Sequence, residues 1–337
     1  MGETAGGRTA SRPPDPETAG RVVIAMGGNA LLRRGEDDAI EVMRRNARLA
    51  GEGVAEIAAR GWEVVITHGN GPQVGRILLQ NEAARDWVTP MPLDVCGAES
   101  QGQVGYLLQV AIGDVFYERN MERPVAMVLT LTRVRPDDPA FEKPTKPIGP
   151  YYDEREAKRL AGERGWSVAP TPDGGWRRVV PSPRPYSIVE GQVIRQLAES
   201  GVIVIASGGG GVPVIEEGPR LVGVEAVVDK DLAACILARD VEAEVLLILT
   251  DVEGVFENYG RPEQRLIDWL RPEDALRMLE EGELPAGSMG PKMEAAAEFV
   301  SGGGKAAVIA SLDQAFEALE GRAGTRIAHE RAEGPSG

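Results

Sequence analysis

Short apolar runs rich in β-branched residues alternate with amphipathic segments along most of this 337-residue chain. The clearest runs are RVVIAM (21–26), WEVVIT (62–67), VIVIAS (202–207), EVLLILT (244–250) and KAAVIAS (305–311). Runs this short and this apolar are typical of strands that are buried on both faces. Because helical segments separate them, we predict an α/β fold with a mainly parallel sheet covered by helices on both faces.

Residues 41–61 have helical spacing and end in Gly61, which suits a helix C-terminus. The apolar stripe expected on this helix consists of Val42, Leu49, Val54, Ile57 and Ala58. Further helices are predicted over 72–84, 100–120, 187–200, 231–241, 271–282 and 290–304. Ser187 and Glu190 have the spacing of a capping box at the start of one of them.

Three other segments complete the predicted order of elements. Residues 124–134 predict one more strand, residues 207–215 a glycine-rich loop, and residues 305–311 the last strand. Between about 133 and 186 the composition changes, because ten of the 24 prolines fall there. Proline cannot donate to a strand ladder, so this stretch predicts a small inserted subdomain, with a hairpin tip at 173–175.

The composition narrows the class of protein. A formal net charge of −15 argues against nucleic-acid partners and against membrane surfaces. No run approaches the ~20 apolar residues of a membrane span, and the first residues lack the apolar segment of a secretory signal. Cys96 and Cys235 show no CxxC spacing, so we expect reduced, buried thiols in a cytoplasmic protein. Two histidines exclude a histidine-rich metal site.

Four loops that follow predicted strands have unusual chemistry: Gly27–Asn29, His68–Gly71, Ser207–Gly211 and Thr250–Val252. In a parallel α/β sheet such loops emerge at one edge, where ligands bind. Glycine lets backbone N–H groups approach an anion closely. One Gly-Gly turn could be a tight connection alone, but two glycine-rich loops at one edge favour a phosphate site. The GxxxxGK[ST] and strand-linked GxGxxG patterns are absent, which argues against P-loop and NAD-type sites.

Two lysines stand at predicted helix starts, where the helix dipole disfavours a cation. Lys292 follows Pro291, and Lys230 lies between Asp229 and Asp231 beside an apolar run. Asp229 can cap the following helix, and Asp231 can pair with Lys230 or hold lysines across a cleft. Both lysines could be solvated, but a bound anion would reverse the local electrostatic argument. We therefore treat Lys230, Asp231 and Lys292 as candidate catalytic residues.

A third lysine, Lys146, lies in the proline-stiffened sequence KPTKPIGP. A stiff arm carrying one cation is what a lid needs in order to bring charge over a cleft. A solvent-facing loop lysine is the alternative, and these residues alone do not decide between the two.

Seven blocks then occur in one order: GGNA, HGNGPQVG, PTKPIGP, SGGGGVPV, VDKDLAA, LTDVEGV and GSMGPK. Together they resemble carbamate kinases of the amino-acid kinase superfamily, over about residues 21–327. The resemblance implies a dimeric three-layer αβα sandwich with a lid subdomain inserted at about 133–186. It places the small substrate in the N-terminal half of the domain and the nucleotide in the C-terminal half. It leaves out residues 1–20, whose Gly, Pro and Thr content suggests a disordered leader, and a tail over 328–337. It also implies ATP and Mg²⁺ as cofactors, carbamate or carbamoyl phosphate as substrate, and Mg²⁺ held mainly by nucleotide phosphates rather than by protein ligands.

The resemblance also implies roles for individual residues. Residues expected at the substrate and phosphate site are Gly27, Gly28, Asn29, Gly69, Asn70, Gly71, Gly208, Gly209, Gly210 and Gly211. Residues expected near the nucleotide are Thr250, Asp251, Val252, Ser288 and Met289. Lys146, Lys230 and Lys292 would neutralise phosphate charge, and Asp231 would orient the lysines.

One position separates this chain from related kinases of the superfamily. Acetylglutamate kinases carry a lysine two residues before the first Gly-Gly, where this chain has Ala25. Lys146 could supply the missing cation from the lid. Carbamate is already an anion and needs no general base, so phosphoryl transfer would depend on positioning and charge neutralisation. The alternatives are another small-anion kinase of the superfamily, a nicotinamide-dependent oxidoreductase and a non-catalytic nucleotide sensor.

Overall fold

The computed structural model describes residues 19–28, 31–32, 35–37, 39–171, 174–283 and 289–331. Within them, one eight-stranded sheet has the order β15-β17-β16-β12-β1-β2-β9-β3. Its strands are β1 (Arg21–Met26), β2 (Glu63–His68), β3 (Val125–Met127), β9 (Ile203–Ile205), β12 (Val245–Thr250), β15 (Trp269–Leu270), β16 (Ala306–Ser311) and β17 (Thr325–Ile327). Neighbouring strands are parallel except β16 and β17, so the predicted mainly parallel sheet is confirmed.

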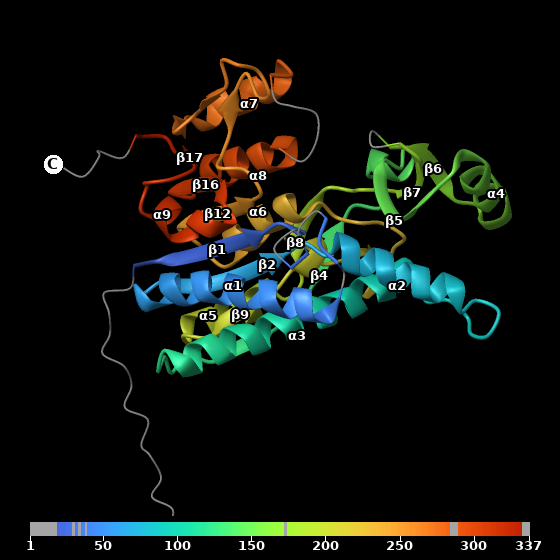
Figure 1. Cartoon of the computed structure of the whole chain (residues 1–337), viewed down its shortest axis with the longest axis horizontal. Helices are drawn as coiled ribbons and strands as arrows, with labels where there is room; N and C mark the ends of the chain where they lie inside the picture. The colour runs from blue at the N-terminus through green and yellow to red at the C-terminus, as the bar shows by residue number, and fades with distance from the viewer. Residues whose placement is uncertain are drawn as a thin grey trace, which may run out of the picture.

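Helices cover both faces of this sheet (Figure 1). They are α1 (Ile40–Ala59), α2 (Gly71–Ala83), α3 (Leu93–Glu118), α4 (Glu154–Arg164), α5 (Gly191–Glu199), α6 (Lys230–Asp240), α7 (Pro272–Glu280), α8 (Met289–Ser301) and α9 (Ala315–Leu319). Alternate residues of β1 feed two cores. Val22, Ile24 and Met26 pack with α1, α3 and α9, whereas Val23 and Ala25 pack with α5, α6 and α8. This alternation produces the predicted three-layer αβα sandwich.

A second, four-stranded sheet has the order β11-β10-β4-β8. Its strands are β4 (Leu131–Val134), β8 (Pro185–Ile188), β10 (Val212–Glu217) and β11 (Arg220–Gly223). A short ribbon of β13 (Phe256–Glu257) and β14 (Arg265–Leu266) follows β12. Within the part of the chain that the structure describes, no helix is both long enough and apolar enough to cross a membrane.

The proline-rich stretch contains a separate small sheet of order β5-β7-β6, which projects beside α2 together with α4 (Figure 1). Its strands are β5 (Lys146–Tyr152), β6 (Ser167–Pro170) and β7 (Trp176–Val180). Strands β6 and β7 pair antiparallel, as the predicted hairpin requires. Helix α4 was not expected from the sequence, because only Ala157 and Leu160 of this charged segment are buried. We call residues 146–180 the arm.

The strand predicted over 124–134 is wrong as a single element. The chain divides into β3 of the large sheet and β4 of the four-stranded sheet. Between them, the backbone N–H of buried Thr130 donates to the carboxamide oxygen of Gln101, and the Thr130 carbonyl oxygen accepts from the carboxamide nitrogen, at 3.0 Å each. The same carbonyl oxygen also accepts from the backbone N–H of Val212 at 2.9 Å. The Gln101 side chain thus replaces a strand partner where the chain changes sheets, which the local apolar pattern could not show.

The capping box at Ser187 and Glu190 is also wrong. Ser187 lies in β8, which pairs with β4, and the following helix begins at Gly191 without a side-chain cap. The carboxylate of Glu190 instead accepts a hydrogen bond from the backbone N–H of Leu131 at 2.8 Å. Strand pairing holds Ser187 extended, so its hydroxyl cannot reach the first turn of α5.

Three smaller predictions need correction. Leu49 is 46% exposed, because α1 packs through small residues such as Ala47 and Ala50 and through Gly51, where a Cβ atom would lie 3.3 Å from the Ala111 carbonyl oxygen. The predicted loop 207–215 contains the first residues of β10. The strand at 305–311 is not the last, because β17 adds antiparallel beside it. Most of the predicted leader and most of the tail lie outside the described residues.

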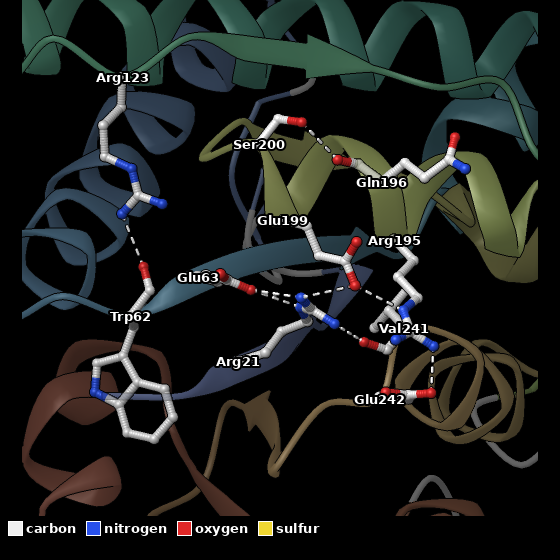
Figure 2. A network of polar contacts seen from close by, with 10 residues as sticks. All are labelled: Arg21, Trp62, Glu63, Arg123, Arg195, Gln196, Glu199, Ser200, Val241 and Glu242. Atoms are coloured by element: carbon white, nitrogen blue, oxygen red, sulfur yellow. Dashed lines mark hydrogen bonds and ion pairs between the residues drawn. The ribbon is translucent and has the colours of Figure 1, made fainter. Parts of the chain in front are cut away.

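A charged network joins the amino ends of the strands (Figure 2). Arg21 at the start of β1 pairs with Glu63 of β2 at 2.6 Å and with Glu199 of α5 at 3.8 Å. Arg123 donates to the carbonyl oxygens of Trp62, at 2.8 Å, and Gly201, at 3.2 Å. These contacts lie at the edge of the sheet opposite the glycine-rich loops. At that edge the charged side chains are bonded to other groups of the protein.

Candidate active site

A cavity of about 990 Å³ lies at the carboxyl ends of β1, β2, β12 and β16 and extends to the arm. The edge predicted from the loop chemistry is therefore the edge that is hollowed. The residues proposed from the sequence that line it are Gly27, Gly28, Gly69, Asn70, Gly71, Lys146, Gly209, Lys230, Asp231, Thr250, Asp251 and Lys292. Segments separated by more than 200 residues in sequence thus supply one surface.

The other proposed site residues either do not line the cavity or fall outside the described residues. Gly208, Gly210 and Gly211 are buried beside Gly209 but do not line the cavity, and neither do Val252 and Met289. Asn29 and Ser288 fall outside the described residues.

Two glycines are required by close approach. A Cβ atom on Gly69 would lie 2.6 Å from the backbone nitrogen of Gly28, so the first two loops touch only because neither carries a side chain there. Gly209 has φ +64°, and its Cβ would lie 2.1 Å from Asn70 Nδ2. Asn70 is itself held by a 2.7 Å hydrogen bond to Ser100 Oγ. The loops therefore present backbone to the cavity, which suits an anionic ligand.

Asp231 joins two of the lysines. Lys230 Nζ lies 2.5 Å from Asp231 Oδ1, and Lys292 Nζ lies 3.3 Å from Asp231 Oδ2. Asp231 is 2% exposed and Lys292 is 5% exposed. The two lysines lie in the first turns of α6 and α8, which pack against each other. One carboxylate between two ammonium groups leaves a net positive charge, which the adjacent helix N-termini reinforce.

Asp229 and Lys146 form the second ion pair, at 2.8 Å, and this pair links the arm to the body. Asp229 also caps α6, because its side chain accepts a 2.9 Å hydrogen bond from the backbone N–H of Asp231. Burial alone would raise the pKa of Asp229, but the charge and hydrogen bond of Lys146, the backbone N–H of Asp231 and the charge of Lys230 together hold that pKa below its ordinary value. The two aspartates that flank Lys230 therefore have different partners: Asp229 pairs with Lys146, and Asp231 pairs with both Lys230 and Lys292.

Burial lowers the pKa of Lys292 below its ordinary value, although the neighbouring Asp231 carboxylate acts in the opposite direction. His68 is buried, and desolvation lowers its pKa to about 4, so the ring is neutral near pH 7. Its Nδ1–H donates to the Gly69 carbonyl oxygen at 3.0 Å, which supports the loop. The ring does not line the cavity.

The cavity also contains residues that the sequence reasoning missed. Arg76 of α2 and Arg177 of β7 line it, as do Ser311, the last residue of β16, and Asp313, which follows that strand. Ser311 pairs in register with Thr250, so applying the strand-end rule to β16 would have found Ser311 and Asp313. No local signal marked Arg76 or Arg177, because both lie inside elements rather than at strand ends.

The thiols of Cys96 and Cys235 are free and buried, as expected, and burial raises the pKa of each to about 11. Among the described residues, no group of three His, Cys, Asp or Glu side chains is placed to hold a metal ion.

Comparison with known proteins gives a consistent result. The model of the amino acid kinase family matches residues 20–311. Carbamate kinase of Pyrococcus horikoshii is 52% identical over 309 residues, covering 91% of this chain and 98% of the relative. Carbamate kinase of Haemophilus influenzae is 47% identical over 308 residues, covering 91% of this chain and 96% of the relative.

Solved structures agree with the sequence relatives. The carbamate kinase from Giardia lamblia bound to AMP-PNP has a TM-score of 0.86 and 44% identity, over 92% of this chain and 98% of that one. An N-acetylglutamate synthase from Neisseria gonorrhoeae, at 17% identity and a TM-score of 0.55, shares the fold alone. The chain belongs to the amino acid kinase family and, within it, to the carbamate kinases.

Proposed function

We propose that the chain catalyses reversible phosphoryl transfer between ATP and carbamate, giving ADP and carbamoyl phosphate. The observation that carries this proposal is the convergence of Lys146, Lys230 and Lys292 on one cavity rimmed by glycine-rich loops. The three lysines come from the arm and from two helices, and two aspartates hold them in place. The relatives at about half identity are carbamate kinases, which supports the same substrate here.

The two reactants are both anions, so their mutual repulsion is the main obstacle to transfer. Lys230 and Lys292 neutralise the polyphosphate, and backbone N–H groups of the Gly27–Gly28 and Gly69–Gly71 turns hold the transferred group. Thr250 and Asp251 lie on the nucleotide side. Lys146 brings a further cation from the arm to the small substrate.

The residues present fit Mg²⁺ that is bound chiefly by the nucleotide. Mg²⁺ prefers oxygen ligands and is often held by one or two carboxylates together with substrate phosphates. Four acidic side chains line the cavity; Asp229 and Asp231 are paired with lysines, which leaves Asp251 and Asp313 as the candidate metal ligands. Among the described residues, no group of three His, Cys, Asp or Glu side chains could hold the ion without the nucleotide. When bound, the ion would neutralise phosphate charge.

Carbamate needs no general base, and the site matches that requirement. The carboxylates nearest the lysines, half-buried Asp229 and buried Asp231, are already engaged in ion pairs. His68 is turned into its own loop. Asp231 is therefore assigned to organising the lysines rather than to moving a proton.

We expect the pH dependence of kcat/KM to report Lys292. Measured with carbamoyl phosphate and ADP and corrected for substrate ionisation, kcat/KM should fall as pH rises through the lowered Lys292 pKa, because only the charged amine neutralises phosphate. The fall should begin before the ordinary lysine value of 10.5. No ionisation of His68 is expected near 6.5, since burial lowers its pKa to about 4. A group titrating near 6.5 would argue for general base catalysis.

A coupled assay of ADP phosphorylation by carbamoyl phosphate tests the proposed reaction. The competing candidate, another small-anion kinase of the family, is tested by measuring ATP cleavage with carbamate, N-acetylglutamate and UMP. Turnover with N-acetylglutamate or UMP but not with carbamate would show that the chain is a different small-anion kinase of the family. NAD binding would favour an oxidoreductase, and nucleotide binding without turnover would favour a sensor. The cytoplasmic location expected from the sequence stays a prediction.

We also propose that the protein is a homodimer, with α3 in the interface. One face of α3 exposes Val95, Tyr106, Val110 and Tyr117, and Tyr106 is 60% exposed. The spacing of these residues puts them on one side of the helix, where an apolar patch favours a protein partner. Tyr106→Asp with Val110→Asp should halve the mass measured by light scattering. Tyr259→Asp, on a different surface, is the control, and an unchanged mass in the α3 variant would remove α3 from the interface.

A further inference from the structure

Arg177 of β7 is a cation on the arm with a different environment from that of its neighbour. Successive residues of a strand point to opposite faces. Arg177 accordingly lines the active-site cavity, whereas Arg178 lines a second cavity of about 750 Å³ behind the arm. Arg178 pairs there with Glu225 at 2.5 Å and lies 4.9 Å from the centre of the Trp166 ring. Arg178 is thus engaged away from the active-site cavity.

The guanidinium of Arg177 is oriented by the backbone and not by an acid. Its Nε and Nη2 donate to the Gly149 carbonyl oxygen at 3.1 and 2.7 Å, and its Cζ lies 5.0 Å from the centre of the Tyr151 ring. No carboxylate of the described residues pairs with it, whereas Lys146, Lys230 and Lys292 each contact an aspartate. The positive charge that Arg177 brings to the cavity is therefore not offset by a paired carboxylate of the described residues.

The geometry leaves one side of the guanidinium available. One edge, formed by Nε and Nη2, is taken by the Gly149 oxygen, so the remaining N–H groups of Nη1 and Nη2 form a second edge. Such an edge matches two oxygens of a phosphate or carboxylate. Fixing the first edge lowers the conformational cost of using the second.

The position of Gly149 indicates which reactant this edge serves. A Cβ atom on Gly75 of α2 would lie 3.7 Å from Gly149 Cα, so this part of the arm rests on the helix that follows the His68–Gly71 loop. Thr250 and Asp313, on the nucleotide side, come from the opposite half of the sheet. We propose that Arg177 is a binding residue for the small substrate and donates to an anionic oxygen of carbamoyl phosphate or carbamate. This inference rests on the proposed function.

A purely structural role for Arg177 predicts different behaviour. The Gly149 carbonyl lies where the pairing of β5 with β7 shifts register, so Arg177 could simply satisfy that oxygen. Arg177→Gln separates the two roles, because glutamine can still donate one hydrogen bond but carries no charge. Arg178→Gln is the matched control, since it removes the same charge from the next residue on the other face.

The experiment measures ADP phosphorylation by carbamoyl phosphate in wild type, Arg177→Gln, Arg177→Lys and Arg178→Gln. Arg177→Gln should raise the KM for carbamoyl phosphate about tenfold to a hundredfold, the size of a lost charge-assisted hydrogen bond. The KM for ADP should stay within about twofold in the same variant. Arg177→Lys should recover part of the loss, and Arg178→Gln should resemble wild type.

Calorimetry with carbamoyl phosphate alone gives a second readout that needs no turnover, and its Kd should rise in Arg177→Gln by the same factor. Equal KM and Kd values in Arg177→Gln, Arg178→Gln and wild type would overturn the inference, as would a change confined to the KM for ADP. An inactive wild type would instead mean that the proposed function is wrong, so the two failures are distinguishable.

Discussion

We expect Lys292→Ala and Lys230→Ala each to lower the rate of ADP phosphorylation by carbamoyl phosphate about a hundredfold, while both proteins remain folded. A preorganised charge aimed at a developing anion is worth on the order of 3 kcal/mol of transition-state stabilisation, which corresponds to that factor. Both amines lie on the wall of the cavity, and both are held by Asp231. The measurement is kcat at saturating substrates, with circular dichroism as the check on folding.

Two companion variants sharpen this result. Lys292→Met keeps most of the buried stem, so a loss equal to that of Lys292→Ala assigns the effect to the charge rather than to a cavity. Lys305→Ala removes one positive charge from an exposed lysine that pairs with Glu244 just before β16, away from the cavity. It should retain the wild-type rate. A near-wild-type rate in Lys230→Ala or Lys292→Ala would remove that lysine from the site.

Asp231→Ala should lower the free energy of unfolding by about 3–5 kcal/mol, the cost of breaking a buried ion pair by removing one partner. Without this carboxylate, Lys230 and Lys292 would be two neighbouring cations in a largely buried setting, with side chains 14% and 6% exposed. The effect is measured by chemical denaturation without nucleotide, because a bound polyphosphate would neutralise the two lysines in place of Asp231 and stabilise the variant.

The double variant Asp231→Ala with Lys292→Met tests the cause. Replacing the unpaired Lys292 ammonium by an apolar side chain should restore most of the stability and none of the activity, because the effects of Asp231 and Lys292 on stability are coupled. Asp229→Ala serves as the control for burial. Its partner Lys146 is 38% exposed, so the free energy of unfolding should fall less than in Asp231→Ala when this lysine is left unpaired. Full stability in Asp231→Ala would show that solvent already screens the two lysines.

Much of the fold was predictable because its signals are local. The central residues of strands β1, β2, β12 and β16 are apolar on both faces, and burial on both faces follows from that pattern. The loops after β1, β2 and β12 meet at one edge because the strands are parallel, and that rule alone placed Gly27, Gly69 and Thr250 around the cavity. The lysine at 292 was visible because a cation in a first helical turn contradicts the helix dipole.

The errors share a different cause. The predicted strand is interrupted at Thr130, where the side chain of Gln101, 29 residues earlier, hydrogen-bonds both the backbone N–H and the carbonyl oxygen. Glu190 does not form the predicted capping box because its carboxylate accepts a hydrogen bond from the backbone N–H of Leu131. Leu49 is exposed because α1 approaches α3 through small residues. In each instance a contact distant in sequence overrides a local preference that is worth only about 1 kcal/mol.

The sequence by itself determined the αβα architecture, the edge that holds the loops and the lysines that stand out there, because periodicity and helix-end chemistry are properties of neighbouring residues. The tertiary structure alone decided that Asp231 serves Lys292, 61 residues away, that Asp229 holds the arm through Lys146, and that Arg177 faces the cavity while Arg178 faces away. Such pairings depend on which surfaces pack together, and packing is fixed only when the whole chain has folded.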